Sequence, residues 1–145
     1  MDDNYLIQID GRMEQGGEEA DTVRLMTRGS FVRRGGSFFI SYAETEATGF
    51  EGCTTTVRVA QDGSRVSMIR YGRAPSQLVI EKGVRHLCHY ETGFGAMTLG
   101  VAADEITHRL TDEGGQVEFS YTLDLDTAGT ISRNLVRITV RPAVS

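Results

Sequence analysis

The sequence predicts an all-β protein: one closed antiparallel β-barrel in a meander of roughly 8–10 strands, covering residues 1–145 as a single domain. Residues 37–45 (SFFISYAET) alternate strictly, with Phe38, Ile40 and Tyr42 on one face. The same alternation recurs to the end of the chain between Gly- and Asp-rich turns, and no convincing helical pattern interrupts it. An open sheet of this size would leave two unpaired edges, so we expect it to close.

In the first half of the chain, strands are expected wherever apolar residues recur at every second position. Gly35-Gly36 and Asp62-Gly63 separate such stretches, and Asp-Gly is a dipeptide typical of tight hairpins. The first five predicted strands cover residues 4–13, 20–29, 37–45, 53–59 and 66–71.

The second half continues the pattern with shorter and less regular stretches. Residues 104–111 fit a helix or a strand, and Thr107 together with the lack of an apolar stripe favours the strand. The turns are short, so strands adjacent in sequence are expected to be adjacent in the sheet. The remaining predicted strands cover residues 78–80, 85–92, 97–101, 117–126 and 136–140.

The charge balance argues against a nucleic-acid partner. The formal net charge is −5, and Lys82 is the only lysine among 15 basic residues. Arg33-Arg34 lies at a predicted hairpin tip, where we interpret it as solvated. The chain shows neither a signal-peptide pattern nor a stretch of about 20 apolar residues, so we expect a cytoplasmic protein without a membrane partner. Cys53 and Cys88 are then expected to be reduced.

Short motifs follow one another along almost the whole chain. They are Ile40-Ser41-Tyr42 with Glu44, Gly52 with Thr54-Thr55, Arg70 followed by Gly72, Tyr90-x-Thr92 with Phe94-Gly95, Gly115-x-Val117, and Tyr121. In this order they resemble the YwiB-like family, a bacterial domain of unknown function with a calycin-like (lipocalin-like) β-barrel. The resemblance implies that fold and a bacterial cytoplasmic setting, and it supplies no substrate, reaction or catalytic residue. Gly93 departs from the family, which usually has proline there.

Several polar residues continue faces that are otherwise apolar, and these form the candidate ligand site. Burying Arg70 or Glu44 alone would cost several kcal/mol, so the two are expected to pair. In the functional interpretation Arg70 binds an anionic group of a small, amphipathic or anionic ligand inside the barrel, and the tyrosines provide walls and hydroxyl donors. The candidate residues are Tyr42, Glu44, Arg70, Tyr90, Thr92 and Tyr121.

A second interpretation remains open for the same residues. Barrels of about eight strands are often filled by their own side chains, and the polar group would then be a structural network that closes one end. The protein would act through its outer surface, as a protein-interaction or homodimer module. Met26 and Phe39, which fall on outward faces, are candidates for that surface.

Metal binding and catalysis have weaker support in the sequence. His86 and Cys88 share a strand face, but His89 points to the other one, and further zinc ligands such as Cys53 and His108 are not demanded by the spacing. A thiol site built from Cys88, a histidine and Glu44 has only composition in its favour. We therefore expect no metal, no cofactor and no catalytic residue.

Overall fold

The computed structural model describes residues 4–16, 21–91, 95–125 and 129–143. These residues form ten strands, and within the described ranges there is no helix. The strands are β1 (Tyr5–Glu14), β2 (Asp21–Arg34), β3 (Ser37–Ala43), β4 (Thr54–Ala60), β5 (Arg65–Tyr71), β6 (Ser76–Glu81), β7 (Arg85–Glu91), β8 (Ala96–His108), β9 (Gly115–Leu125) and β10 (Gly129–Pro142).

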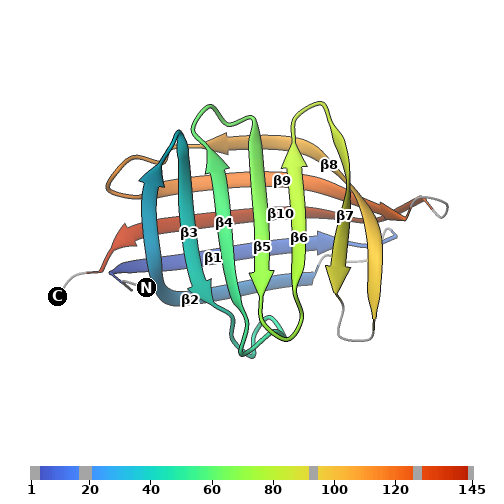
Figure 1. Ribbon diagram of the computed structural model, residues 1–145, viewed down its shortest axis with the longest axis horizontal. Coiled ribbons are helices and arrows are strands. Elements are labelled where there is room, and N and C mark those ends of the chain that lie inside the picture. Colours follow the sequence, from blue (N-terminus) through green and yellow to red (C-terminus); the bar gives the residue numbers. More distant parts are fainter. Residues whose placement is uncertain (1–3, 17–20, 92–94, 126–128, 144–145) are drawn as a thin grey trace.

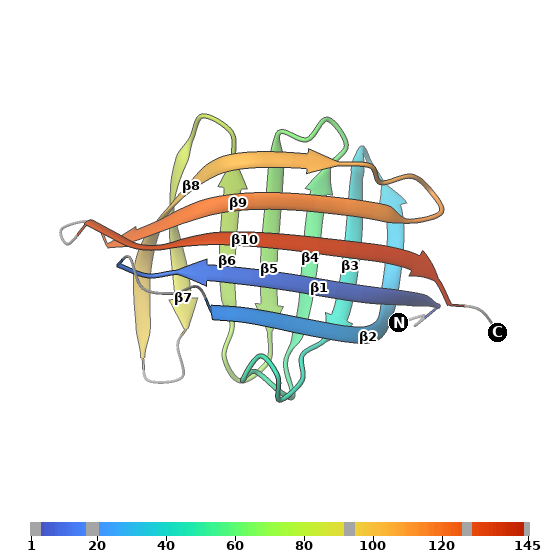
Figure 2. The same cartoon turned by 180° about the vertical axis from the view of Figure 1, so that it is seen from behind.

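The ten strands close into one antiparallel barrel, as the sequence predicts. Each strand pairs with its neighbour in sequence, and β1 pairs with β10 to complete the ring. Ile7 of β1, for example, lies opposite Val140 of β10 and Thr27 of β2. The barrel is flattened into two layers: β3–β7 in front run across β1, β9 and β10 behind (Figures 1 and 2).

Strand β2 belongs to both layers, and Gly29 marks the place where it passes from one to the other. Gly29 is the last residue of β2 that pairs with β1 and the first that pairs with β3. A Cβ atom at this position would lie 2.2 Å from the carbonyl oxygen of Ser41 and 2.4 Å from Cδ1 of Ile7. Only glycine allows such a close approach of backbone and core.

The centre of the barrel is filled by side chains. The rings of Phe31 and Phe38 stack with centroids 5.8 Å apart, and the alternating residues Phe38, Ile40 and Tyr42 all point inward, as predicted. The largest side chains with almost no exposure come from both layers and form one continuous core. They are Phe38, Phe119, Ile7, Ile40, Ile80, Ile138, Val57, Val59, Val66, Val101 and Val117.

Several strands are longer than the sequence indicated. Residues 104–108 are the end of β8, so the strand interpretation of this segment is confirmed, and a bulge between Ala103 and Glu105 bends the strand. Arg33 and Arg34 are the last residues of β2, and Arg33 forms an ion pair with Asp112 at 3.1 Å.

Two further findings concern the thiols and the bilayer. Cys53 and Cys88 are both buried and form no disulfide with each other. Within the described ranges, the chain has no helix with the length and hydrophobicity needed to cross a membrane.

Candidate functional site

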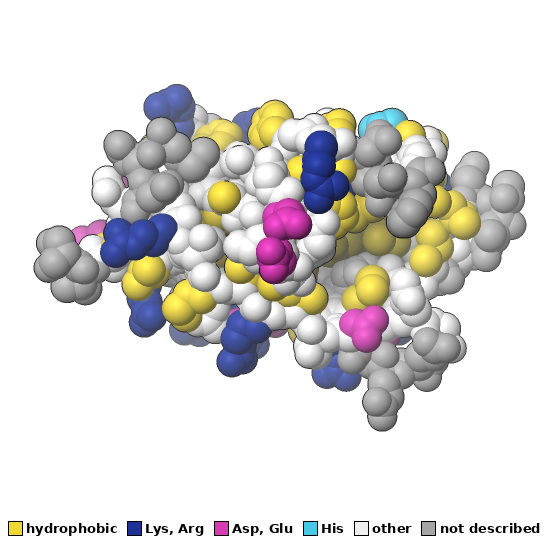
Figure 3. Space-filling model, turned by 90° about the horizontal axis from the view of Figure 1, so that it is seen from below, with side chains coloured by type: hydrophobic (Ala, Val, Ile, Leu, Met, Phe, Trp, Pro, Cys, Tyr) yellow, Lys and Arg dark blue, Asp and Glu magenta, His cyan; other side chains and the backbone are white. Residues whose placement is uncertain are grey.

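A cavity of about 120 Å³ lies inside one end of the barrel. It is near the segment between β3 and β4 (residues 44–53) and the turn between β5 and β6 (residues 72–75). Seen from this end, the molecule is hollowed, and hydrophobic side chains line the hollow (Figure 3). The lining residues come from six segments: Glu44, Thr55, Met68, Arg70, Ser76, Leu78, Tyr90 and Tyr121.

Strand alternation explains how most of these side chains reach the cavity. Met68 and Arg70 of β5 follow the buried Val66 at intervals of two, and Leu78 of β6 precedes the buried Ile80 in the same way. Tyr121 of β9 continues the inward face of Phe119 from the opposite layer. The cavity is therefore the point where the regular apolar filling of the barrel gives way to polar groups.

The structure brings most of the predicted site residues together. Glu44, Arg70, Tyr90 and Tyr121 line the same cavity, and Tyr42 lies buried beside Glu44. Thr92 lies outside the described residues. Glu44 and Tyr121 are far apart in the sequence but meet here because the sheet closes into a barrel. Closure places β9 of the back layer across from β5 and β6 of the front layer.

The side chain of Arg70 is only 8% exposed, and its surroundings differ from those expected. Nε donates a hydrogen bond of 2.6 Å to the carbonyl oxygen of Ala74, and the guanidinium lies over the ring of Phe50 at 3.5 Å and over that of Tyr90 at 5.1 Å. The expected pairing with Glu44 is wrong: no ion pair between described residues joins the two. Aromatic faces and a backbone carbonyl stabilise the buried cation.

The carboxylate of Glu44 is stabilised by hydroxyl groups. Its two oxygens accept hydrogen bonds of 2.6 Å from Thr48 and from Thr55. Burial raises the pKa of the neighbouring Tyr42 phenol well above its ordinary value, and the negative charge of Glu44 raises this pKa further. Tyr42 therefore stays a neutral phenol at physiological pH.

Tyr121 supplies the group in the cavity that is open to a ligand. Burial, together with Tyr90, raises the pKa of its phenol, so the hydroxyl stays protonated and can donate. None of the hydrogen bonds between described residues involves this hydroxyl. In the described ranges, every side-chain oxygen or nitrogen that is completely buried has a hydrogen-bond partner. The Tyr121 hydroxyl has none among the described residues, so it is not completely buried and is accessible from the cavity that Tyr121 lines.

Sequence reasoning missed several residues of this site. Thr55, Met68 and Leu78 follow the same alternation as residues that the sequence assigned inward, so the signal for them was present. Phe50 could not be found in this way, because it lies between strands, where no periodicity applies. The carbonyl of Ala74 is a backbone group, and because every residue has one, the residue type gives no signal for it.

Three of the residues considered for metal or thiol chemistry are engaged in structural contacts. Cys88 Sγ accepts a hydrogen bond of 3.4 Å from the backbone nitrogen of Val79, and Nε2 of His86 lies 3.2 Å from Glu81. His108 binds the carbonyl oxygen of Gln61 and accepts from the backbone nitrogen of Leu110. The part of the chain that the structure describes contains no group of three or more residues placed to hold a metal ion.

The two outward residues named from the sequence are on the surface of different layers. Met26 of β2 is 55% exposed on the back layer. Phe39 of β3 is half-buried in the front layer, where the guanidinium of Arg58 lies 5.4 Å from its ring centroid.

Comparison with known proteins agrees with this fold. The crystal structure of the ywiB protein from Bacillus subtilis is similar over 97% of this chain and 92% of that chain, with a TM-score of 0.81 and 18% sequence identity, a level that shows the fold. No curated protein matches the sequence. A family model described as a domain of unknown function (DUF1934) matches residues 7–138. The chain therefore belongs to the DUF1934 family, the YwiB-like domains of unknown function that its sequence motifs resemble.

Proposed function

We propose that this barrel is a non-catalytic binding module that holds one small amphipathic or anionic molecule in the cavity at its end. The observation that carries the proposal is the hydroxyl of Tyr121. It belongs to a side chain only 7% exposed, it lines the cavity, and it makes no hydrogen bond with another described residue. A buried donor of this kind gains a partner when a ligand arrives.

The size of the cavity limits the ligand. An apolar cavity of about 150 Å³ holds one benzene molecule, and drug-sized ligands occupy roughly 300–1,000 Å³. The space of about 120 Å³ therefore fits a molecule of only a few heavy atoms. A larger ligand would have to extend out of the barrel end.

The lining has two chemical sides. Met68 and Leu78 provide apolar contact, and the hydroxyl of Tyr121 provides a donor. The lining holds both the cation of Arg70 and the carboxylate of Glu44. Because Glu44 already accepts two threonine hydroxyls, the attraction for a negatively charged or electron-rich group on the ligand comes from Arg70. A short carboxylic acid with a hydrocarbon body matches both sides.

The same geometry favours binding over catalysis. Both carboxylate oxygens of Glu44 already accept hydrogen bonds from threonine hydroxyls. Glu44 therefore acts as a hydrogen-bond acceptor within the protein and is not placed to act as a general base. Tyr42 and Tyr121 have raised pKa values and are poor bases or nucleophiles at neutral pH. The residues of the cavity thus position and solvate a ligand and do not activate one.

The test compares two variants that each remove one phenolic oxygen. Tyr121→Phe changes the cavity, whereas Tyr71→Phe changes an exposed residue of β5. We titrate propionate, benzoate and their neutral alcohols into isotope-labelled protein and follow backbone NMR shifts. Carboxylates should shift residues around the cavity and bind more tightly than the alcohols. Tyr121→Phe should weaken binding by about tenfold, the equivalent of one hydrogen bond, and Tyr71→Phe should bind like the wild type.

Two results would overturn the proposal. Either none of the four compounds perturbs the resonances of the cavity, or Tyr121→Phe binds as tightly as the wild type. Thermal unfolding of all three proteins checks that the variants are folded before binding is compared.

A further inference from the structure

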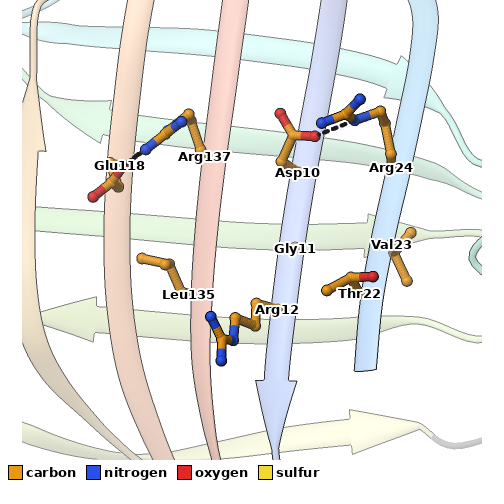
Figure 4. A pocket seen from close by; sticks show the side chains of 9 residues that line it. All are labelled: Asp10, Gly11, Arg12, Thr22, Val23, Arg24, Glu118, Leu135 and Arg137. Atoms are coloured by element: carbon orange, nitrogen blue, oxygen red, sulfur yellow. Dashed lines mark hydrogen bonds and ion pairs between the residues drawn. The ribbon is translucent and has the colours of Figure 1, made fainter. Parts of the chain in front are cut away.

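Four charged residues lie in one straight row across the outer face of the back layer. Glu118 of β9 lies opposite Arg137 of β10, Arg137 opposite Asp10 of β1, and Asp10 opposite Arg24 of β2. Their signs alternate along the row, as − + − +. Figure 4 shows all four side chains above the same four strands. We call this set the charge row.

Within the molecule the charge row forms two separate ion pairs. Arg24 Nε lies 2.7 Å from Asp10 Oδ1, and Arg137 Nη2 lies 2.7 Å from Glu118 Oε2. The arginine side chains are 77% and 52% exposed, respectively. Solvent-exposed pairs contribute little to folding, so stability alone gives no strong reason for this ordered alternation.

Apolar side chains are exposed beside the charge row. Met26, two residues after Arg24 on β2, is 55% exposed, and Leu135, two residues before Arg137 on β10, is 38% exposed. A shallow depression lies beside the charge row and is lined in part by Gly11, Arg12 and Thr22 (Figure 4). The face thus combines a charged stripe with apolar contact area and a shallow depression, a combination found at protein interfaces.

The order of the charges makes the row complementary to itself. When two copies meet face to face around a two-fold axis parallel to the strands, the row of one copy is reversed against that of the other. Glu118 then faces Arg24 of the second copy, and Arg137 faces Asp10. Each copy makes the same contacts in return, which is the property of an isologous interface.

The neighbouring positions agree with this arrangement. Leu135 lies opposite Arg12 in the register of β10 and β1, so the same operation places Leu135 of one copy against the stem of Arg12 of the other. Met26 falls against Gln116 of the second copy, since the two lie at opposite ends of one row. If the two-fold axis ran along the charge row instead, each charged residue would face the same residue of the second copy. Like charges would then lie opposite each other and repel.

The area is adequate for a modest interface. Four strands spaced about 4.8 Å apart, each about 34 Å long for ten residues, cover on the order of 650 Å². Standard complexes bury about 800 Å² on each partner. Face-to-face sheets of this kind pack with their strands within about 30° of each other, which fits an axis near the strand direction.

We propose that the outer face of β1, β2, β9 and β10 is a homodimer interface in which a second copy of this chain packs face to face, with its charge row antiparallel to the first. The proposal does not depend on the ligand cavity, which opens at one end of the barrel and lies on the inner side of the sheet.

The experiment uses two charge-reversal variants, Arg137→Glu and Asp10→Arg. Each one alone sets two like charges against each other at both symmetry-related contacts, so each should lose at least tenfold in self-association. In an equimolar mixture, however, Glu at position 137 of one chain faces Arg at position 10 of the other, and the remaining three contacts of the row are still complementary. The mixture should therefore recover the dimer. Sedimentation velocity across a dilution series measures all three samples and the wild type.

Arg34→Glu is the matched control, because it reverses an exposed arginine at the end of β2, far from the charge row. It should associate like the wild type. A wild type that is monomeric throughout the series would overturn the proposal. So would single variants that remain dimeric, or a mixture that stays monomeric while the wild type dimerises. Thermal unfolding of each variant confirms that it is folded, which is expected since all three side chains are on the surface.

Discussion

Gly29 and Gly11 are both glycines inside strands, yet their surroundings are opposite. A Cβ at Gly29 would overlap the Ser41 carbonyl at 2.2 Å, whereas the nearest atom to a Cβ at Gly11 is 4.0 Å away. Gly29→Ala should therefore lower the free energy of unfolding by about 3 kcal/mol. Gly11→Ala should leave it unchanged or raise it by about 0.5 kcal/mol through the unfolded state. Urea denaturation of the two variants measures the difference, and equal effects would contradict the role given to Gly29.

Gly100 has a different reason to be glycine. A Cβ there would lie 2.3 Å from Nη2 of Arg85, whose guanidinium crosses this position to bind Asp124 at 3.1 and 2.5 Å. These hydrogen bonds, with the charge of Arg85, hold the pKa of Asp124 below its ordinary value of 3.8. The stabilisation is therefore present above this ordinary value and is lost as the pH falls through the lowered pKa.

Two variants should raise the pKa of Asp124 by separate routes. Arg85→Gln removes the cation, and Gly100→Ala displaces it. A carbon-13 NMR titration of the aspartate carboxyl groups follows the change directly. Both variants should move Asp124 toward 3.8, and an unchanged value in Gly100→Ala would show that Arg85 does not need the space above this glycine.

At the scale of elements, the boundary between β6 and β7 is the weakest part of the barrel. The register of these two strands contains a single pair, Ser76 with Tyr90, besides the bridge between Glu81 and Val84 at the turn. Midway along the boundary, the backbone nitrogen of Val79 donates to Cys88 Sγ at 3.4 Å and not to a carbonyl. Sulfur is a weak acceptor, so this boundary should open more easily than the continuous ladder of β9 and β10.

Hydrogen exchange tests this difference. Amides of β6 and β7 that face each other should exchange before those of β9 and β10, and Cys88→Ala should accelerate exchange at Val79. Cys53→Ala, which removes the other buried thiol, serves as the control and should leave Val79 unchanged. Uniform protection around the ring would contradict a weak β6–β7 boundary.

The elements were largely predictable because period two is imposed by the pleat itself. Every expected strand is present, and residues 104–108 belong to β8 as favoured. The bounds were less predictable, since pairing with a neighbour extends a strand past its apolar residues. Strand β2 continues to Arg34 in this way because it pairs with β3, although Arg33 and Arg34 have no strand character of their own.

At the scale of the whole molecule, the inward faces predicted much of the cavity. Glu44, Arg70, Tyr90 and Tyr121 meet because each continues an apolar face and closure brings those faces together. The partners of Arg70 were not predictable, because Phe50 lies outside any strand and Ala74 contributes a carbonyl. The charge row was also hidden, since it depends on the exact register between the two ends of the chain.

The central claim is that the cavity beside Tyr121 is a ligand site. Native mass spectrometry of gently purified wild-type protein tests this claim most directly, with Tyr121→Phe prepared in parallel. We expect a reproducible small adduct on the wild type that is reduced or absent on Tyr121→Phe, together with unchanged occupancy on Tyr71→Phe. A wild-type protein with only its bare mass, both before and after incubation with propionate and benzoate, would contradict the account and leave a barrel that is filled and works through its outer surface.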